Sequence, residues 1–407
     1  MANNTTTMTD GPLVEPHPTG LTRTGRSRLE AIDMLRGLVI AIMVLDHVRD
    51  FFHSSANAFD PTDAAQSWPL LYLTRWVTHL CAPTFVLLSG VSIYLQKANG
   101  KTGGDLSRFL LSRGLWLVFL ECTVVMFAWN FGRPFFLLQV IWAIGWSMVA
   151  MALIARLGDK VVLGLGLAVV ALSPLALPPF APAQDAVMIT RELLFGASPV
   201  VGAPVFIAYA IIPWLGVMAI GFGIGPIFAM ESPRRNRLLV GLSVALLGVF
   251  FLLRSLNNYG TPVPWRTFAD PTRTVMSFFD IFKYPPSPDY VAITLGLSLL
   301  IFLAIQHLRG PLARILGDFG RTPLFTYVAH LYIAHGLMLA AAIAIGRPQA
   351  ALNLFDQIFD GHPPQNWGWS LGVVYFVWLL VLVILVPLSR WFAGVKRRRR
   401  DWWLSYL

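Results

Sequence analysis

The sequence predicts an all-α, polytopic membrane protein with about ten transmembrane helices and both termini in the cytoplasm. Hydrophobic residues make up 56% of the 407 residues and charged residues only 13%, whereas charged residues make up about 25% of an average soluble domain. The mean hydropathy is +0.63. This composition excludes disordered and collagen-like chains. The two cysteines, Cys81 and Cys122, each lie in an apolar stretch, which excludes a secreted disulfide scaffold.

Ten apolar stretches are each near the roughly 20 residues that a helix needs to cross about 30 Å of hydrocarbon. Only Gly132 and Arg133 separate the third stretch from the fourth, which predicts a tight hairpin there. No internal repeat is visible, which disfavours the transporter folds that are built from related halves. The expected spans cover residues 31–53, 69–95, 108–131, 134–156, 161–179, 203–229, 238–255, 288–308, 319–346 and 367–393.

Polar segments flank the membrane domain that we expect over residues 28–394. Residues 1–27 are rich in Thr, Pro and Gly and carry no apolar run, so we expect a disordered cytoplasmic tail without a cleavable signal peptide. Residues 395–407 join a basic run to Trp402 and Trp403, which is typical of an aromatic anchor at the membrane interface.

The distribution of basic residues predicts the orientation. With the N-terminus inside, 21 of the 31 Lys and Arg fall on the cytoplasmic side, nine fall outside and Arg36 lies within the first span. This asymmetry follows the positive-inside rule, and it accounts for an isoelectric point of about 9.9 without a nucleic-acid partner. The long loops, at about 54–68, 180–202, 256–287 and 347–366, then lie outside. Such length is typical of recognition at the outer face or of plain connecting segments.

The first span carries the densest set of ionisable side chains, which are costly in a membrane and therefore candidates for function. At 100° per residue, Asp33, Arg36, His47 and Asp50 fall on one stripe. Arg36 and His47 are eleven residues, or about 16 Å, apart along the axis. That distance is close to the reach of the pantetheine arm of an acyl-CoA. The alternative is that Arg36 extends to the inner headgroups and His47 only terminates the helix.

Further polar groups are expected at the outer mouth. Arg75 and His79 begin the second span on one helix face, at the depth of His47, Asp50 and His53. The histidines and Asp50 are plausible metal ligands, but the chain shows no compact ligand motif and Arg75 would repel a cation. We therefore expect no metal.

The third span begins with a basic pair, Arg108 and Arg113, and carries Glu121 and Asn130 farther along. The pair could hold phosphate groups or anchor the helix at the inner surface. Glu121 requires a partner, a proton or a wet cavity, because an isolated buried carboxylate is costly. Asn130 could bind an acceptor or cap the hairpin.

The ninth span places Tyr327 with His330, and Tyr332 with His335, at spacing i, i+3. The two histidines lie 140° apart on the helix, so only one can face a given cavity and the other is expected to pack. An outer loop carries the proline-fixed run Lys283-Tyr284-Pro285-Pro286-Ser287, which could cover the outer mouth or form a structural turn.

Some of these motifs resemble those of known protein families. The spacing of Arg36 and His47 in a first transmembrane helix resembles the membrane-bound acyltransferase-3 superfamily. The wider runs from Arg28 to Gly37 and from Met43 to His47 resemble bacterial proteins with the heparan-alpha-glucosaminide N-acetyltransferase catalytic domain. The resemblance extends over about 28–394. Two later runs also look like the same group: Phe282-Lys283-Tyr284-Pro285-Pro286-Ser287 and Gly320-Arg321-Thr322-Pro323-Leu324-Phe325.

The resemblance implies an acyltransferase that moves an acyl group, which we expect to be acetyl. The group would pass from cytoplasmic acyl-CoA to a sugar or glycan acceptor at the far face of a bacterial inner membrane. The resemblance also implies that His47 is the catalytic histidine, that Arg36 organises the donor channel and that Arg108 and Arg113 hold the phosphates of the acyl-CoA. In the lysosomal branch, an amide residue stands where we align His47, and the reactive histidine follows in the next outer segment. His53 is the nearest counterpart here, so His47 and His53 are alternatives.

The mechanism expected from these residues is general-base catalysis. His47 would deprotonate an acceptor hydroxyl or amine, with Asp50 or Asp46 orienting its ring. Arg75 or His79 would stabilise the oxyanion. Substrate contacts are further expected from Glu121, Asn130, Lys283, Tyr284 and His330.

The competing class is a transporter or lipid flippase that uses buried His, Arg and Glu as an ion or proton pathway. Binding of acyl-CoA at the cytoplasmic side discriminates between the two classes, because a transporter does not need it. A purely structural subunit is a third class, which the cost of a charged stripe disfavours. The sequence carries no signal for an oligomeric state.

Overall fold

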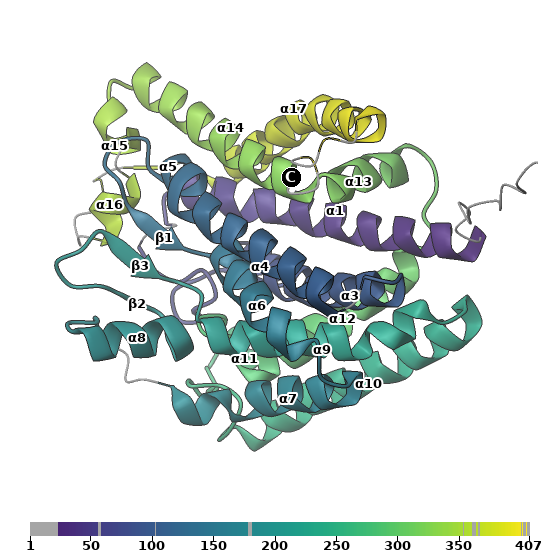
Figure 1. The fold of residues 1–407 in the computed structure, drawn as a ribbon. Helices are drawn as coiled ribbons and strands as arrows, with labels where there is room; N and C mark the ends of the chain where they lie inside the picture. Colours follow the sequence, from purple (N-terminus) through teal and green to yellow (C-terminus); the bar gives the residue numbers. More distant parts are fainter. Residues whose placement is uncertain are drawn as a thin grey trace, which may run out of the picture.

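Long helices run side by side through the computed structural model, with α1 in their midst (Figure 1). The structure describes residues 23–55, 58–101, 103–177, 181–352, 354–359, 364, 367–399, 401 and 404. Residues 1–22 of the tail expected over 1–27 and most of the expected aromatic anchor lie outside these residues, whereas residues 23–27 of that tail were wrongly expected to be disordered and belong to the first helix. The helices are α1 (Arg23–Phe52), α2 (Pro69–Thr78), α3 (Cys81–Ala98), α4 (Gly103–Leu120), α5 (Met126–Trp129), α6 (Val140–Ile154), α7 (Asp159–Leu172), α8 (Ala186–Phe195), α9 (Ile211–Ala229), α10 (Ser232–Leu256), α11 (Pro271–Phe278), α12 (Pro288–Ile305), α13 (Pro311–Arg321), α14 (Pro323–Ala344), α15 (Pro348–Leu352), α16 (Leu354–Phe359) and α17 (Leu371–Arg398).

The all-α membrane fold is confirmed. Each of the ten expected spans falls on helical structure, and eight described helical segments are long and apolar enough to cross a membrane. Two expected spans lie outside that set. The first, α1, carries several charged side chains, and the fourth, α6, has only 15 residues. A polar α1 is compatible with a membrane only because the other helices surround it.

A small sheet corrects two helix boundaries. The strands are β1 (Phe136–Leu138), β2 (Ser198–Pro199) and β3 (Val205–Ile207), in the order β1-β3-β2, with β1 parallel to β3. The predictions that helices begin at residues 134 and 203 were therefore wrong: α6 begins at Val140 and α9 at Ile211. Apolar strands are difficult to distinguish from the start of an apolar helix by sequence pattern alone.

The second span is broken into two helices. α2 ends at Thr78 and α3 begins at Cys81, and the intervening His79 carbonyl accepts a hydrogen bond of 3.0 Å from the Tyr290 hydroxyl on α12. Residues 79 and 80 keep helical dihedral angles, so α3 continues the course of α2, and Arg75 and Thr78 near the end of α2 bond to Asp46 on α1.

Close backbone approach holds α13 against α1. A Cβ atom on Gly37 would overlap the Leu316 carbonyl, and one on Gly320 would overlap the Asp33 carbonyl. Because 37 pairs with 316 and 33 with 320, the two helices run antiparallel. Only glycine permits this distance. The packing explains both glycines and holds the N-terminal half of α1 beside α13.

Short elements gather at the end of the bundle where α1 finishes. They are the sheet, α8, α15 and α16, and they lie together on the left of Figure 1. Four of them, α8, β2, α15 and α16, arise from the long loops that the basic-residue distribution assigns to the outer side, whereas β1 and β3 lie at the start of the expected fourth and sixth spans. The opposite end carries the start of α1, the start of α10 and the end of α17 (Figure 1).

Candidate functional site

Two histidines from different helices meet in the interior. Nδ1 of His47 on α1 lies 2.7 Å from Nε2 of His330 on α14, and the two rings stack with 5.0 Å between their centroids. His47 is 8% exposed and His330 is fully buried. The sequence named both residues but predicted no contact between them, because they are 283 positions apart.

The hydrogen-bond chain assigns the protons on this pair. Nδ1 of His330 lies 3.2 Å from the Thr326 carbonyl, which can only accept, so this nitrogen is the donor. Nε2 of a neutral His330 is then an acceptor, and Nδ1 of His47 donates to it. In a neutral His47 this leaves Nε2 with an unprotonated lone pair. A buried imidazole can act as a general base when one ring nitrogen is unprotonated and the other is held by a hydrogen bond.

Two aromatic side chains line the histidine pair. Trp129 packs edge-on against His47 with 4.8 Å between ring centroids, and Tyr327 packs against it at 6.3 Å. The Trp129 Nε1 and the Tyr327 hydroxyl are buried and lie close to each other, and neither makes a hydrogen bond of good geometry within the described part of the chain. Buried donors of this kind require water or a ligand. The interior beside His47 therefore offers two unused donors.

The carboxylates of α1 contact arginines. Asp46 accepts hydrogen bonds from Arg75 at 2.9 Å and from the Thr78 hydroxyl at 2.9 Å, and it lies 3.0 Å from Arg49. Asp50 pairs with the same Arg49 at 2.5 Å. The ring of His47, which Asp46 or Asp50 was expected to orient, is held by His330 instead. These ion pairs are buried, and removal of one partner would leave an uncompensated charge.

The other outer histidines have separate surroundings. Nδ1 of His53 lies 2.8 Å from the Ser55 hydroxyl, and its ring packs near Trp68. His79 is 2% exposed and packs edge-on against Tyr290, and its Nδ1 has no described hydrogen-bond partner. Among the described residues, no group of three or more His, Cys, Asp or Glu is arranged to hold a metal ion.

Lys283 and Tyr284 lie in the loop between α11 and α12. Lys283 is 7% exposed, and its ammonium lies 5.6 Å and 5.0 Å from the ring centroids of Tyr209 and Tyr284. It is an electrostatic neighbour of Asp46, His47 and His79. The structure therefore joins the proline-fixed loop to the polar stripe of α1.

Asp280 is a partly buried carboxyl in the same loop. Burial raises the pKa of Asp280 to about 7, and the neighbouring Asp60 carboxyl acts in the same direction because like charges repel. The Thr62 hydroxyl, by hydrogen bonding to the carboxylate form, opposes this rise. Asp280 therefore titrates near neutral pH.

Two residues expected near a substrate have structural contacts. Glu121 lies at a π-helical turn, η1 (Glu121–Val125), and accepts a hydrogen bond of 2.8 Å from the backbone N–H of Gln139, the residue before α6. The Asn130 side chain donates to the Arg133 carbonyl at 2.7 Å. Glu121 thus caps the start of α6, and Asn130 closes the α5–β1 connection. Oε2 of Glu121 and Oδ1 of Asn130 are buried without a hydrogen-bond partner among the described residues.

A basic cavity of about 410 Å³ opens at the other end of the bundle. Arg36 lines it, held by Asp33 at 3.2 Å and by the Ser92 hydroxyl. Arg113 and Lys396 also line it, from α4 and α17. Arg108 is exposed and is not among the lining residues. The structure thus brings Arg36 and Arg113 together and adds Lys396, which sequence spacing gave no reason to select.

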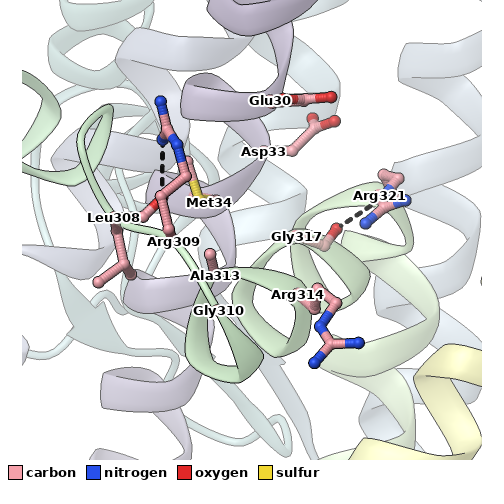
Figure 2. Close-up of a pocket in the computed structure, with 10 residues that line it drawn as sticks. All are labelled: Glu30, Asp33, Met34, Leu308, Arg309, Gly310, Ala313, Arg314, Gly317 and Arg321. Atoms are coloured by element: carbon pink, nitrogen blue, oxygen red, sulfur yellow. Dashed lines mark hydrogen bonds between the residues drawn. The ribbon is translucent and has the colours of Figure 1, made fainter.

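A second pocket of about 600 Å³ lies on the other side of Asp33 (Figure 2). Glu30 and Asp33 come from α1, and Arg314 and Arg321 come from α13. The Arg321 side chain donates back to the Gly317 carbonyl at 2.9 Å. Asp33 and Arg321 line both pockets, so the two cavities are neighbours at the basic end of the bundle.

Of the histidines on α14, His335 serves packing. Its ring stacks on Phe131 with 3.7 Å between centroids, and its nitrogens contact the carbonyls of Ala128 and Ala351. It links α14, α5 and α15. The expectation that one of the two histidines packs is met by His335, while His330 faces His47.

Comparison with known proteins identifies a relationship. The family model described as "Heparan-alpha-glucosaminide N-acetyltransferase, catalytic" matches residues 28–258. This range contains α1 to α10 and therefore His47, Arg75, His79 and Arg113. A search of curated proteins found no match.

Proposed function

The chain belongs to the heparan-alpha-glucosaminide N-acetyltransferase catalytic-domain family, and from this we propose that it transfers an acetyl group from cytoplasmic acetyl-CoA to an acceptor at the opposite face of the membrane. The acceptor is a hydroxyl or amine of a sugar or glycan. We propose that the membrane is a bacterial inner membrane, with both termini in the cytoplasm. The observation that carries the proposal is the free Nε2 of His47, which the hydrogen bond to His330 leaves as a base inside the membrane domain.

In the proposed reaction, Nε2 of His47 takes the proton of the acceptor while the acceptor oxygen or nitrogen attacks the thioester carbonyl carbon. The tetrahedral intermediate then collapses, the C–S bond breaks and the CoA thiolate leaves with the proton that His47 has held. The net result is an acetylated acceptor and free CoA. His330 keeps the His47 ring in the required tautomer, as the acidic residue does in a catalytic triad.

The oxyanion of the intermediate needs donors that are not already engaged. Arg75, one of the residues suggested by sequence, is held by Asp46. The unused donors nearest the ring of His47 are the Trp129 Nε1 and the Tyr327 hydroxyl. Donors fixed in a dry interior stabilise a developing charge more effectively than water does. We assign them to the thioester oxygen.

The donor is proposed to enter through the basic cavity. Arg36 and Arg113 with Lys396 provide cations for the phosphates, as guanidinium and ammonium groups do in nucleotide sites. From Arg36 the axis of α1 rises about 16 Å to His47, so a pantetheine arm that follows α1 would bring the thioester to the histidine pair. The residues fit acetyl-CoA as co-substrate.

Calorimetric titration of the purified full chain in detergent with acetyl-CoA tests this proposal. We expect saturable binding, weakened at least about tenfold by Arg113→Ala, because a charge-assisted phosphate contact is worth more than about 1.4 kcal/mol. Arg237→Ala, an exposed arginine on α10, is the matched control and should not change the affinity. The affinity of Arg108→Ala for acetyl-CoA reports whether Arg108, the exposed member of the pair predicted with Arg113, contributes to binding. Folded protein that binds neither acetyl-CoA nor a longer acyl-CoA would reject the acyltransferase and favour the transporter.

A further inference from the structure

A cavity of about 290 Å³ lies between α7 and α10, away from the candidate site, and its lining is entirely apolar. Leu163 and Val170 line it from α7, and Leu242 and Val249 line it from α10. The remaining lining residues are Leu, Ile, Val, Ala and Pro residues of α3, α7, α9, α10 and α12. An engineered apolar cavity of about 150 Å³ stays dry and binds benzene. The chemistry of this larger cavity therefore fits a hydrocarbon ligand.

The cavity opens at the side of the bundle. Leu167 and Val249 at its rim are 52% and 45% exposed, whereas Val291 and Leu295 of α12 at its base are 3% and 2% exposed. Both α7 and α10 are apolar enough to cross a membrane, and most of each faces outward. Outward apolar faces of membrane helices contact the acyl chains of lipids. A chain can therefore enter the cavity from the bilayer, between the two helices.

α7 and α10 begin at the same end of the bundle. Leu163 lies against Gly223 of α9, and Val169 lies against Gly216, so α7 and α9 run antiparallel. The end of α9 is therefore beside the start of α7, and α10 begins directly after α9, at Ser232. Both helices lie along the lower edge of Figure 1. The cavity thus has one end near the two helix starts and one end near the two helix ends.

Basic side chains gather at the end where α7 and α10 begin. Lys160 precedes Leu163 by three residues, and Arg234 and Arg237 precede Leu242 by eight and five residues. All three cations are exposed. At about 1.5 Å per residue, they stand roughly 5 to 12 Å along the helix axes from the first lining residues. A ligand with a chain in the cavity would therefore place its polar end among them.

The net charge at this end of the cavity is positive. Of the acidic residues at the starts of the two helices, Asp159 already pairs with Lys97 at 2.9 Å. Glu231, the residue before α10, is the second. The three exposed cations therefore exceed the remaining carboxylate by two charges, and this end favours an anionic group.

The opposite end of the cavity is closed. Tyr259, in the loop after α10, donates a hydrogen bond to the carbonyl of Ala171 on α7, and Ala171 lines the cavity. This bond connects the end of α7 to the segment that follows α10. The closed end suits the methyl terminus of a chain, and the polar group belongs at the basic end.

We propose that this cavity binds one acyl chain of an anionic phospholipid, with the phosphate held by Lys160, Arg234 and Arg237. The chain lies against α12, the helix whose Tyr290 hydroxyl contacts the His79 carbonyl. A basic side chain near an anionic headgroup is worth about fivefold in affinity. The apolar lining selects the chain, and the three cations select the headgroup. The inference goes beyond the proposed function and does not depend on it, since it concerns lipid binding alone.

Native mass spectrometry of the delipidated full chain, released from detergent, tests the proposal. Dioleoyl-phosphatidylglycerol is the probe, and dioleoyl-phosphatidylcholine, which has the same chains and no net charge, is its comparison. We expect one phosphatidylglycerol to bind at least about fivefold more tightly than phosphatidylcholine. We also expect it to raise the thermal unfolding temperature, since a ligand of the folded state stabilises that state.

A substitution that fills the cavity locates the chain. Val249→Trp places an indole in the cavity from its rim and should remove the tightly bound phosphatidylglycerol. Val244→Trp is the matched control, because Val244 is on the same helix, is 64% exposed and is not among the lining residues. Should Val249→Trp not fold, Ala171→Phe fills the cavity from α7. Its control is then Ala168→Phe, at an exposed position of α7 that is not among the lining residues.

Substitution of the cations tests the headgroup. Lys160→Gln combined with Arg234→Gln should weaken phosphatidylglycerol at least about fivefold and leave phosphatidylcholine unchanged. Arg397→Gln is the control, because Arg397 is an exposed cation near the end of α17, on the other side of the bundle (Figure 1).

Two results would overturn the proposal directly. Equal affinity of the two lipids for the wild type would remove the anionic headgroup, and phosphatidylglycerol that stays tightly bound in folded Val249→Trp would place the lipid elsewhere. A third result has the same effect: a dimer that Val249→Trp converts to a monomer, without specific lipid binding, would assign the cavity to a second copy of the chain. Loss in Val249→Trp, with retention in Val244→Trp, supports the lipid site whether or not the chain binds acetyl-CoA.

Discussion

His47 donates its Nδ1 proton to Nε2 of His330 across the α1–α14 interface, at 2.7 Å. The Thr326 carbonyl orients the second ring in turn. A carboxylate in the place of His330 would bring a further negative charge into an interior that already holds Asp46 and Asp50. The neutral histidine orients the ring without that charge, while the two aspartates pair with arginines.

The role of His47 predicts a separation between chemistry and binding. His47→Ala should lower acetyl transfer by about 10²-fold or more, since a general base contributes on that scale. Acetyl-CoA affinity measured by calorimetry should not change. His53→Ala is the companion variant, because His53 is the alternative implied by the lysosomal branch, and it should retain transfer. The reverse pattern would move the base to His53.

His330 is a positioning residue, so its substitution should be rescued by a group of similar geometry. His330→Leu removes the acceptor for the His47 Nδ1 proton, and we expect kcat to fall while KM for acetyl-CoA changes little. His330→Gln, whose side-chain oxygen can accept the same hydrogen bond, should recover part of kcat. His335→Gln, on the same helix but at a packing contact, is the comparison for nonspecific damage. Equal loss in the Leu and Gln variants, both folded, would contradict a positioning role.

Trp129 and Tyr327 predict a rate effect without a donor-binding effect. Trp129→Phe and Tyr327→Phe each remove one unused donor while keeping the aromatic ring. Loss of one oxyanion donor typically costs about 10²-fold in kcat. Tyr332→Phe is the control, since that hydroxyl is already engaged with the Val124 carbonyl at 2.9 Å. Unchanged single-turnover rates in both variants would remove these residues from the mechanism.

The contact between α1 and α13 predicts a stability effect. Gly320→Ala places a methyl group on the Asp33 carbonyl, so the helices must separate. Overpacking of this kind costs about 1–3 kcal/mol, and we expect a lower unfolding temperature in detergent. Gly336→Ala is matched, because a Cβ at Gly336 on α14 meets nothing within 4 Å. Similar behaviour of the two variants would show that the backbones are not in close contact.

Asp280 predicts a pH dependence. Its pKa is raised to about 7 in the folded protein from the ordinary value of 3.8 of an aspartate. At a pH between these two values the folded state therefore holds a proton that the unfolded state has released. Folding stability from this group is therefore greatest at low pH and decreases as the pH rises toward about 7. Asp280→Asn removes the dependence. Its unfolding temperature should exceed that of the wild type at pH 8 and approach it near pH 5, and a constant difference across that range would contradict the shift.

The membrane fold was predictable because it depends on composition and periodicity. Apolar stretches of about 20 residues are specified locally, and each of the ten falls on helical structure. The short strands were missed because three apolar residues have no distinctive pattern before they pair with a partner. The break at His79 was missed for a similar reason, since the whole segment 69–98 is apolar enough for one helix.

The sequence by itself determined the helices, the segregation of basic residues and the stripe on α1 that carries Asp33, Arg36 and His47. The spacing along one helix is fixed by 3.6 residues per turn, so those relations needed no tertiary structure. Only the tertiary structure decided that His330 is the partner of His47, that Asp46 pairs with Arg75 and that Lys283 is buried beside the Tyr209 ring. These contacts join positions far apart in the chain, and they depend on how helices pack, which local periodicity does not encode.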